Sequence, residues 1–317
     1  MTEKQRFIKA LKREPITGLV PTFELVFYLT LEAVGKIHPE HRRYYQWNQM
    51  SKTEKQLQLY DMADSYLEVA KKYKHSAIFV HPNPGDFENT VRILEIIREK
   101  SGDEYFLMLH GDPTFSIPDG DSMSEFAERL YNDKTGLKKE AEEMLNERLI
   151  FAEKIEKHKG LLDGFALCSD YCFNVNPFFT PLMFAEFIAP YLSKVIDGYR
   201  ARGFYSIKHT DGNIMPIVDQ MADCKPDALH SLDPQGGVDL KEMRRLYSDR
   251  MCLIGNVNCG LLQTGTIEEC EADIRRSLKD GMEGYGYIFS TSNCVYTGLD
   301  LERYELMNRI WQTEGIY

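Results

Sequence analysis

Short apolar runs alternate with longer amphipathic stretches along the whole chain. Eight runs rich in β-branched and aromatic residues predict strands at 19–25, 76–82, 105–111, 164–170, 205–211, 228–234, 251–257 and 286–292. Stretches with helical periodicity lie between or after them, most clearly at 53–73, 135–155, 181–203, 266–281 and 300–313. A strand followed by a helix about eight times is typical of an α/β protein with a (β/α)8 TIM barrel.

A doubly wound open sheet is the alternative to a closed barrel. No G-x-G-x-x-G motif follows the first predicted strand, and eight repeating units favour closure. No linker-like or low-complexity segment divides the chain. We therefore expect residues 1–317 to form a single barrel domain, with a charged amphipathic helix at 1–15 as an N-terminal extension.

Composition and charge narrow the class of protein. The 317 residues are 43% hydrophobic and 27% charged, which is ordinary for a globular protein. Seven scattered cysteines indicate reduced thiols, and neither a signal peptide nor a membrane span is visible, so we expect a cytoplasmic protein. The net charge of −11, with no basic stripe, argues against a nucleic-acid partner.

Polar side chains mark almost every predicted strand end, where a TIM barrel places its active site. They are Glu24, His81, His110, Asp112, Asp170, His209, Asp211, Asp233, Asn256, Asn258, Asn293 and Cys294. Ordinary turn and cap chemistry explains four of them equally well, namely Asp112, Asp233, Asn256 and Asn258. Three strands that end in histidine fit a functional site better.

The stretch "IKHTDGN" (207–213) is the most informative of these ends. Residues two apart in a strand point to the same face, so His209 and Asp211 are predicted to project into one pocket. Asp211 has an alternative role as the N-cap of a helix in "NIMPIVDQMA" (213–222).

Several blocks in the second half of the chain resemble the uroporphyrinogen decarboxylase superfamily. The block "NPFFTPLMFAEFIAPYLSKVIDGYRARG" resembles that family's P-x-x-S-P-x-x-x-x-E-F-x-x-P-Y helix. It is followed, in the family's order and spacing, by "HTDGNIMPIVDQMADCKPDALH", "LYSDRMCLIGNVNCGLL" and "GYIFSTSNC". The resemblance implies a (β/α)8 barrel, in agreement with the strand count.

The resemblance to true uroporphyrinogen decarboxylases is incomplete. Those enzymes carry an arginine-rich R-Q-A-G-R-Y segment after the first strand, whereas this chain has "PTFELVFYLTLEAVGK", with Glu24 and no arginine. Where they have an aspartate after the second strand, this chain has "FVHPNPG" with His81. A polyanionic porphyrinogen would lack its guanidinium partners here.

The resemblance is closer to the corrinoid-dependent methyltransferase branch, whose thiol-methylating members hold zinc with an H-x-C pair and a later cysteine. This chain has His209 and Cys294, but Asp211 replaces the middle cysteine. The resemblance to relatives that combine histidine with carboxylates makes Asp170 and Glu186 further candidates. Zinc accepts all of these ligand types and keeps an open position in catalytic sites.

The site predicted from these arguments has three parts. The predicted metal ligands are His209, Cys294, Glu186 and Asp211, and the predicted catalytic residues are His209, Asp170 and His81. The predicted substrate-binding residues are Glu24, Phe27, His110, Tyr171, Asn174, Asn176 and Asn256. Structural alternatives are a histidine that only orders its strand end, a buried apolar Cys294, a hydrogen-bonded Glu186 and core packing by Phe27.

The expected function is a zinc-dependent methyltransferase that exchanges a methyl group between a methyl ether, methylamine or thiol and a corrinoid (cobalamin) protein. By resemblance a homodimer is also expected. The first alternative is a cofactor-free decarboxylase (a carboxy-lyase) of another carboxylated substrate, with His81, Asp170 and His209 stabilising a protonated intermediate. The second is a non-catalytic binder of a corrinoid or tetrapyrrole.

Overall fold

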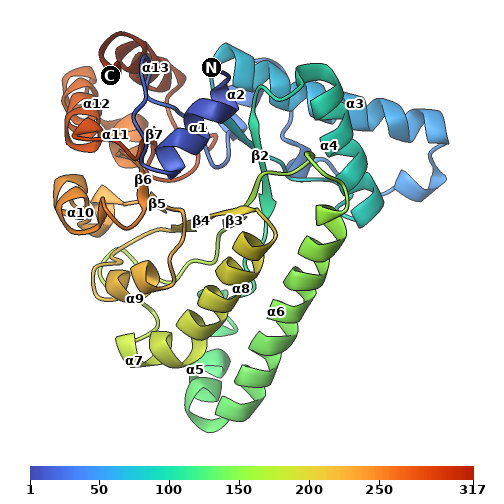
Figure 1. Cartoon of the computed structure of the whole chain (residues 1–317), viewed down its shortest axis with the longest axis vertical. Helices are drawn as coiled ribbons and strands as arrows, with labels where there is room; N and C mark the ends of the chain where they lie inside the picture. The colour runs from blue at the N-terminus through green and yellow to red at the C-terminus, as the bar shows by residue number, and fades with distance from the viewer.

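Seven parallel strands form one sheet, in which each strand pairs with its neighbours in chain order (Figure 1). The computed structural model describes residues 1–317. The strands are β1 (Ala77–Phe79), β2 (Phe106–His110), β3 (Gly164–Leu167), β4 (Tyr205–Thr210), β5 (Ala228–Ser231), β6 (Cys252–Val257) and β7 (Tyr287–Thr291). At least one helix lies between each strand and the next, as parallel pairing requires.

Helices surround the strands, which lie near the centre of the view in Figure 1. The α-helices are α1 (Glu3–Leu11), α2 (Tyr28–Glu32), α3 (Lys52–Lys72), α4 (Phe87–Ser101), α5 (Met123–Asn132), α6 (Lys134–Glu156), α7 (Pro181–Met183), α8 (Ala189–Ala201), α9 (Val218–Asp223), α10 (Leu240–Tyr247), α11 (Cys259–Thr264), α12 (Ile267–Met282) and α13 (Leu301–Glu314). Short 3-10 turns are η1 (Pro39–His41), η2 (Trp47–Gln49) and η4 (Pro234–Gly236), and η3 (Phe184–Ile188) is a π-helix. All five helical stretches predicted from periodicity are present, although 181–203 is divided into α7, η3 and α8.

Alternation along the strands divides the apolar side chains into two cores. In β2, Phe106 and Met108 belong to an inner core, whereas Leu107 and Leu109 belong to the larger core between sheet and helices. The inner core takes residues from all seven strands, so the sheet is curled around it. Helix α1 covers the end of this core at which the strands begin, because Phe7 packs on Phe106 with ring centroids 4.8 Å apart.

The predicted first strand, 19–25, is wrong as a regular strand. This segment forms only isolated bridges, among them a parallel one between Thr22 and Phe289 of β7. The carbonyl of Pro21 accepts from the Phe289 amide (2.9 Å), and the carbonyl of Thr22 accepts from the Ser76 amide just before β1 (2.6 Å). The segment therefore lies between β7 and β1, but Pro21 has no N–H to donate to a ladder. The observed architecture is a curled seven-stranded sheet with an irregular segment between its first and last strands.

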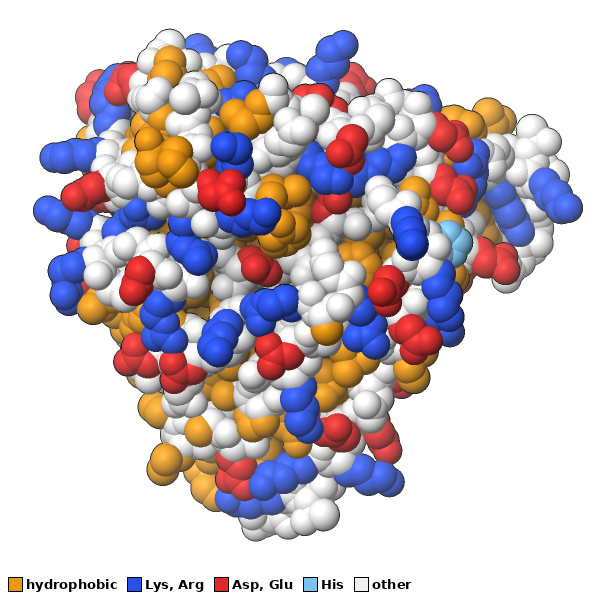
Figure 2. Space-filling view, viewed as in Figure 1, with side chains coloured by type: hydrophobic (Ala, Val, Ile, Leu, Met, Phe, Trp, Pro, Cys, Tyr) orange, Lys and Arg blue, Asp and Glu red, His pale blue; other side chains and the backbone are white.

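The surface carries charges of both signs. Figure 2 shows lysine and arginine side chains interspersed with aspartate and glutamate over the whole visible face, with no region of one sign. None of the helices combines the length and the apolar character that a bilayer span requires.

Candidate active site

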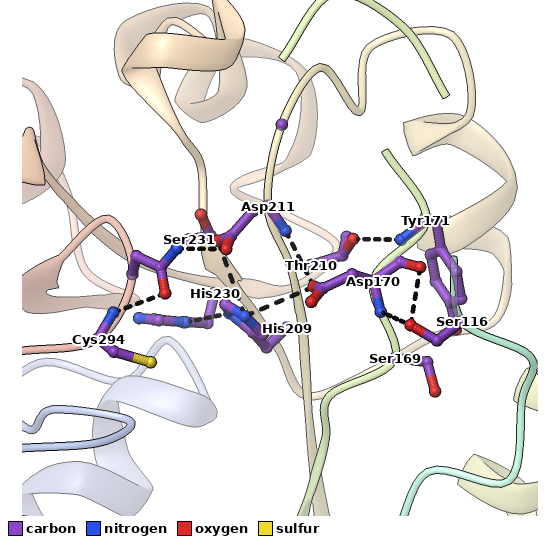
Figure 3. Close-up of polar contacts among 12 residues, drawn as sticks. Ser116, Ser169, Asp170, Tyr171, His209, Thr210, Asp211, His230, Ser231 and Cys294 are labelled. Carbon is purple, nitrogen blue, oxygen red and sulfur yellow. Dashed lines mark hydrogen bonds and ion pairs between the residues drawn. The ribbon is translucent and has the colours of Figure 1, made fainter. Parts of the chain in front are cut away.

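Three predicted residues meet at the ends of β3 and β4 (Figure 3). His209 is buried, and its Nε2 lies 3.7 Å from Oδ1 of Asp170 and 3.7 Å from Oδ1 of Asp211. One potential ligand atom from each residue lies within 4.8 Å of the other two. The side chain of Asp170 is 46% exposed, so the group is open to solvent on one side. The alternation predicted for His209 and Asp211 is therefore observed.

His230 of β5 contacts the other side of the His209 ring. The two residues are paired in the β4–β5 register, and their Nδ1 atoms lie 2.7 Å apart. Burial, and then the neighbouring His209, lower the pKa of His230 well below its usual range, so this ring is neutral. Sequence reasoning missed His230. Its position one residue before the end of its strand, like that of His209, was the available signal.

Glu24 lies behind this histidine pair and does not reach the open mouth. His230 Nε2 contacts the Ser290 hydroxyl at 3.3 Å, and that hydroxyl donates to Glu24 Oε2 at 3.2 Å. The hydroxyl and amide of Thr291 and the Tyr304 hydroxyl also donate to the Glu24 carboxyl. Complete burial raises the pKa of Glu24 to about 7 despite these donors. Direct substrate binding by Glu24 is therefore corrected to an indirect link with His209.

Asp211 is tied to the end of β7 through Asn293. The Asn293 side-chain amide donates to Asp211 Oδ2, and its carbonyl oxygen accepts from the Cys294 amide at 2.7 Å. Oδ1 of Asp211, the atom nearest His209, is buried and has no hydrogen-bond partner. Burial raises the pKa of Asp211, which His209 opposes. The N-cap alternative for Asp211 is wrong, since the next helix is α9 and its N-cap is Ile217.

Cys294 lies close by but outside the group of three. It packs at the edge of the inner core, and Figure 3 shows it beside the histidine pair. Burial raises the pKa of its thiol, and the charge of Asp211 adds to that effect. Cys294 is not among the residues whose ligand atoms converge within 4.8 Å.

His81 and His110 line a separate cavity at the ends of β1 and β2, next to α4 and α6. They share a cavity of about 380 Å³ with Glu40, Asn83 and Arg148. Burial lowers the pKa of His81 to about 4, and its Nδ1 has no hydrogen-bond partner. Burial also lowers the pKa of His110, so both histidines are neutral where they line this polar cavity.

The prediction that Glu186 ligates a metal is wrong. Its two carboxylate oxygens each lie 2.8 Å from a lysine of α6, Lys134 and Lys138. These ion pairs hold η3 against α6, and Glu186 is not part of the group at His209. The structural alternative of a partnered carboxylate is the one observed.

Three predicted substrate-binding residues are buried and used elsewhere. Asn256 donates to the Leu232 carbonyl and accepts from Arg276 of α12. The Tyr171 hydroxyl lies 2.6 Å from that of Thr114. Phe27 packs among aromatic rings in the larger core between sheet and helices, which is the core-packing alternative given for it above. These three side chains serve the packing of the fold, because their polar or aromatic surfaces are already occupied.

Asn174 and Asn176 are exposed in the loop after β3. The Asn176 side chain donates to the Pro177 carbonyl, and no protein partner fixes that of Asn174. The cap reading is confirmed for two strand-end residues: Asp233 caps η4 and Asn258 caps α11.

The group at His209 fits a divalent metal. Ligands at about 2.1 Å from a tetrahedral zinc are about 3.4 Å apart, close to the 3.7 Å between Nε2 and each carboxylate oxygen. The unpartnered Oδ1 of Asp211 is a buried acceptor in need of a cation or proton. One imidazole and two carboxylates also suit manganese or iron, so the donor set alone does not select zinc.

Comparison with known proteins supports the same fold. Residues 171–312 match the family model described as uroporphyrinogen decarboxylase (URO-D), which confirms the resemblance over that part of the chain. A methyltransferase from Methanosarcina mazei superposes with a TM-score of 0.74 at 18% identity, over 99% of each chain. That likeness establishes a shared fold.

Two other similar structures are more distant. They are N-acetylneuraminate lyase from Fusobacterium nucleatum (TM-score 0.40, 11% identity, 82% of this chain and 69% of that one) and enolase from Mycobacterium smegmatis (TM-score 0.41, 12% identity, 99% and 67%). TM-scores this low have no bearing on function. No curated protein matches the sequence.

Proposed function

We propose that the protein is a metal-dependent methyltransferase that exchanges a methyl group between a small substrate and a corrinoid protein, with zinc as the expected metal. The observation that carries the proposal is the convergence of His209, Asp170 and Asp211 at the open end of the curled sheet. The URO-D match and the shared fold with a methyltransferase support it. In this proposal the fold is a (β/α)8 barrel, and residues 19–27 take the place of its eighth strand.

The roles of the residues follow from their positions. His209, Asp170 and Asp211 would hold the metal, and Cys294 remains a predicted fourth contact. A bound zinc would supply Lewis acidity, which improves a thiol as nucleophile or an ether or amine as leaving group. The cavity lined by His81 and His110 would take the body of the substrate. Asn174 and Asn176 would contact substrate or partner from the exposed loop.

Metal binding is the first test. Titration of metal-free protein with Zn²⁺ should show one tight site, and His209→Asn or Asp211→Asn should weaken it by at least about tenfold, because a ligand is lost. His158→Asn, at a histidine just beyond the C-terminal end of α6, is the matched control and should leave the affinity unchanged. A protein with no site tighter than its His209→Asn variant would contradict the metal centre.

Activity separates this proposal from its alternatives. Incubation with methylcobalamin and a thiol, or with cob(I)alamin and methyl ethers or methylamines, should change the corrinoid spectrum, and a chelator should abolish the change. Release of CO2 from a carboxylated substrate, unaffected by chelators, would instead favour the cofactor-free decarboxylase. Saturable corrinoid binding without turnover of any donor would favour a binding protein.

A further inference from the structure

A continuous chain of polar contacts runs from Glu24 to the proposed metal ligands. It passes through Ser290 and His230 to His209, with contacts of 3.2, 3.3 and 2.7 Å. All four members are buried: Glu24, Ser290, His230 and His209. Water therefore cannot supply alternative partners along the chain, and each hydrogen must have a defined place.

The direction of each hydrogen bond follows from the Ser290 hydroxyl. A hydroxyl has a single proton, and Ser290 donates it to Glu24 Oε2. The Thr291 amide and hydroxyl donate to the same oxygen, so Oε2 stays an acceptor even when Glu24 binds a proton, which then sits on Oε1. Ser290 Oγ can then only accept from His230 Nε2–H. His230 is fully buried and pairs with no carboxylate, so a charged imidazolium would be uncompensated there and the ring carries one proton, at Nε2; its Nδ1 is therefore an acceptor. The proton in the 2.7 Å contact between the two Nδ1 atoms consequently belongs to His209.

We propose that Glu24, Ser290 and His230 are positioning residues that hold His209 in the Nδ1–H form and leave its Nε2 lone pair facing Asp170 and Asp211. Without this chain, His209 would be free to carry its proton on Nε2 and donate it to the two carboxylates. With it, three acceptor atoms converge, an arrangement that only a cation or an additional proton stabilises. Hydrogen bonds from the second nitrogen of a metal-binding histidine commonly fix its tautomer in this way.

This inference rests on the proposed metal site, but its first test does not need metal. Nitrogen-15 long-range correlation spectra of metal-free protein, assigned with His209→Gln and His230→Gln, should show a protonated Nδ1 on His209. They should show a protonated Nε2 on His230. A bare Nδ1 with a protonated Nε2 on His209 would overturn the inference. A protein with the expected tautomers that binds no metal would instead overturn only the proposed function.

The second test removes one contact of the chain. Ser290→Ala deletes the acceptor for His230 Nε2, so His230 loses its preference for one tautomer and Zn²⁺ affinity should fall by about tenfold. Ser206→Ala is the matched control, because Ser206 is also buried in a strand but its hydroxyl has no partner. Equal Zn²⁺ affinities for the two folded variants would overturn the role of Ser290. If Ser290→Ala does not fold, the spectra of the unaltered protein decide the matter.

Discussion

The residues in and around the candidate site differ in how far their positions could be predicted from the sequence. His209 and Asp211 follow from alternation along one strand, which is a local property. His230 depends on the register between β4 and β5, and Glu24 on contacts with residues more than 260 positions away. Glu186 of η3 and Asn256 of β6 were misassigned because each faces a cation on a neighbouring helix instead of the mouth. Sequence alone indicated the centre of the site and not what surrounds it.

Glu24 should make stability depend on pH. Its pKa is raised from 4.5 to about 7 in the folded protein, so the folded state binds this proton more tightly than the unfolded chain. The resulting stabilisation is fully present below about pH 4.5 and is lost as the pH rises toward 7. A pKa shift of this size corresponds to about 3 kcal/mol in the free energy of unfolding.

Chemical unfolding of Glu24→Gln between pH 4.5 and 7.5 checks this expectation. The difference in unfolding free energy between the parent and Glu24→Gln should change by about 3 kcal/mol across that range, to the parent's disadvantage as pH rises. Glu32→Gln, at an exposed position, should follow the parent at every pH. Parallel curves for Glu24→Gln and the parent would show that the folded carboxyl titrates normally.

At the scale of elements, β4 serves the site and the fold with alternate residues. His209 points into the mouth, whereas Lys208 points outward and is fully buried. Lys208 Nζ lies 2.8 Å from Asp112 Oδ2 and also donates to the carbonyls of Leu167 and Ser169. This ion pair joins the ends of β2, β3 and β4 and lowers the pKa of Asp112 to about 2 against the effect of burial.

Removal of Asp112 should be strongly destabilising. Asp112→Ala leaves the buried Lys208 charge with two carbonyls and the face of the Tyr171 ring but no anion, which should cost about 3–5 kcal/mol in urea unfolding. Glu242→Ala breaks an exposed ion pair with Arg245 and should cost far less, because water screens that pair. Equal losses in the two variants would mean that Lys208 finds water or another anion once Asp112 is gone.

The strand pattern was predictable where the backbone is regular. Seven of the eight predicted strands are present, because each is an apolar run buried on both faces between an inner and an outer core. The remaining predicted strand, 19–25, has the same apolar character but contains Pro21. Its missing N–H and the hydrogen bonds of Thr22 to two different neighbours prevent a continuous ladder, which composition alone does not reveal.

At the scale of the whole molecule, the two ends of the chain complete the curled sheet together. Both termini lie at the same end of the view in Figure 1. The Val20 amide donates to the Gly315 carbonyl (2.8 Å), and the Trp311 indole of α13 donates to the Val20 carbonyl (3.0 Å). The segment that lies between β7 and β1 is thus held from outside by the last helix. Glu24 belongs to this same segment, so the junction between β7 and β1 (the seam) is connected to the candidate site.

Trp311→Phe tests whether α13 secures this seam. Phenylalanine keeps most of the aromatic packing, including the ring stacked on Phe289, but leaves the Val20 carbonyl without its indole donor. We expect a loss of about 1–3 kcal/mol, because a buried acceptor is left unpaired. Hydrogen exchange should therefore accelerate at Val20 and at Phe289 on β7, whose amide bonds to Pro21.

Trp47→Phe is the matched control, since the Trp47 indole N–H donates no hydrogen bond, and it should leave exchange along 19–27 unchanged. Acceleration confined to α13 would show that the last helix frays alone and that the N-terminal segment holds its place through β7 and β1.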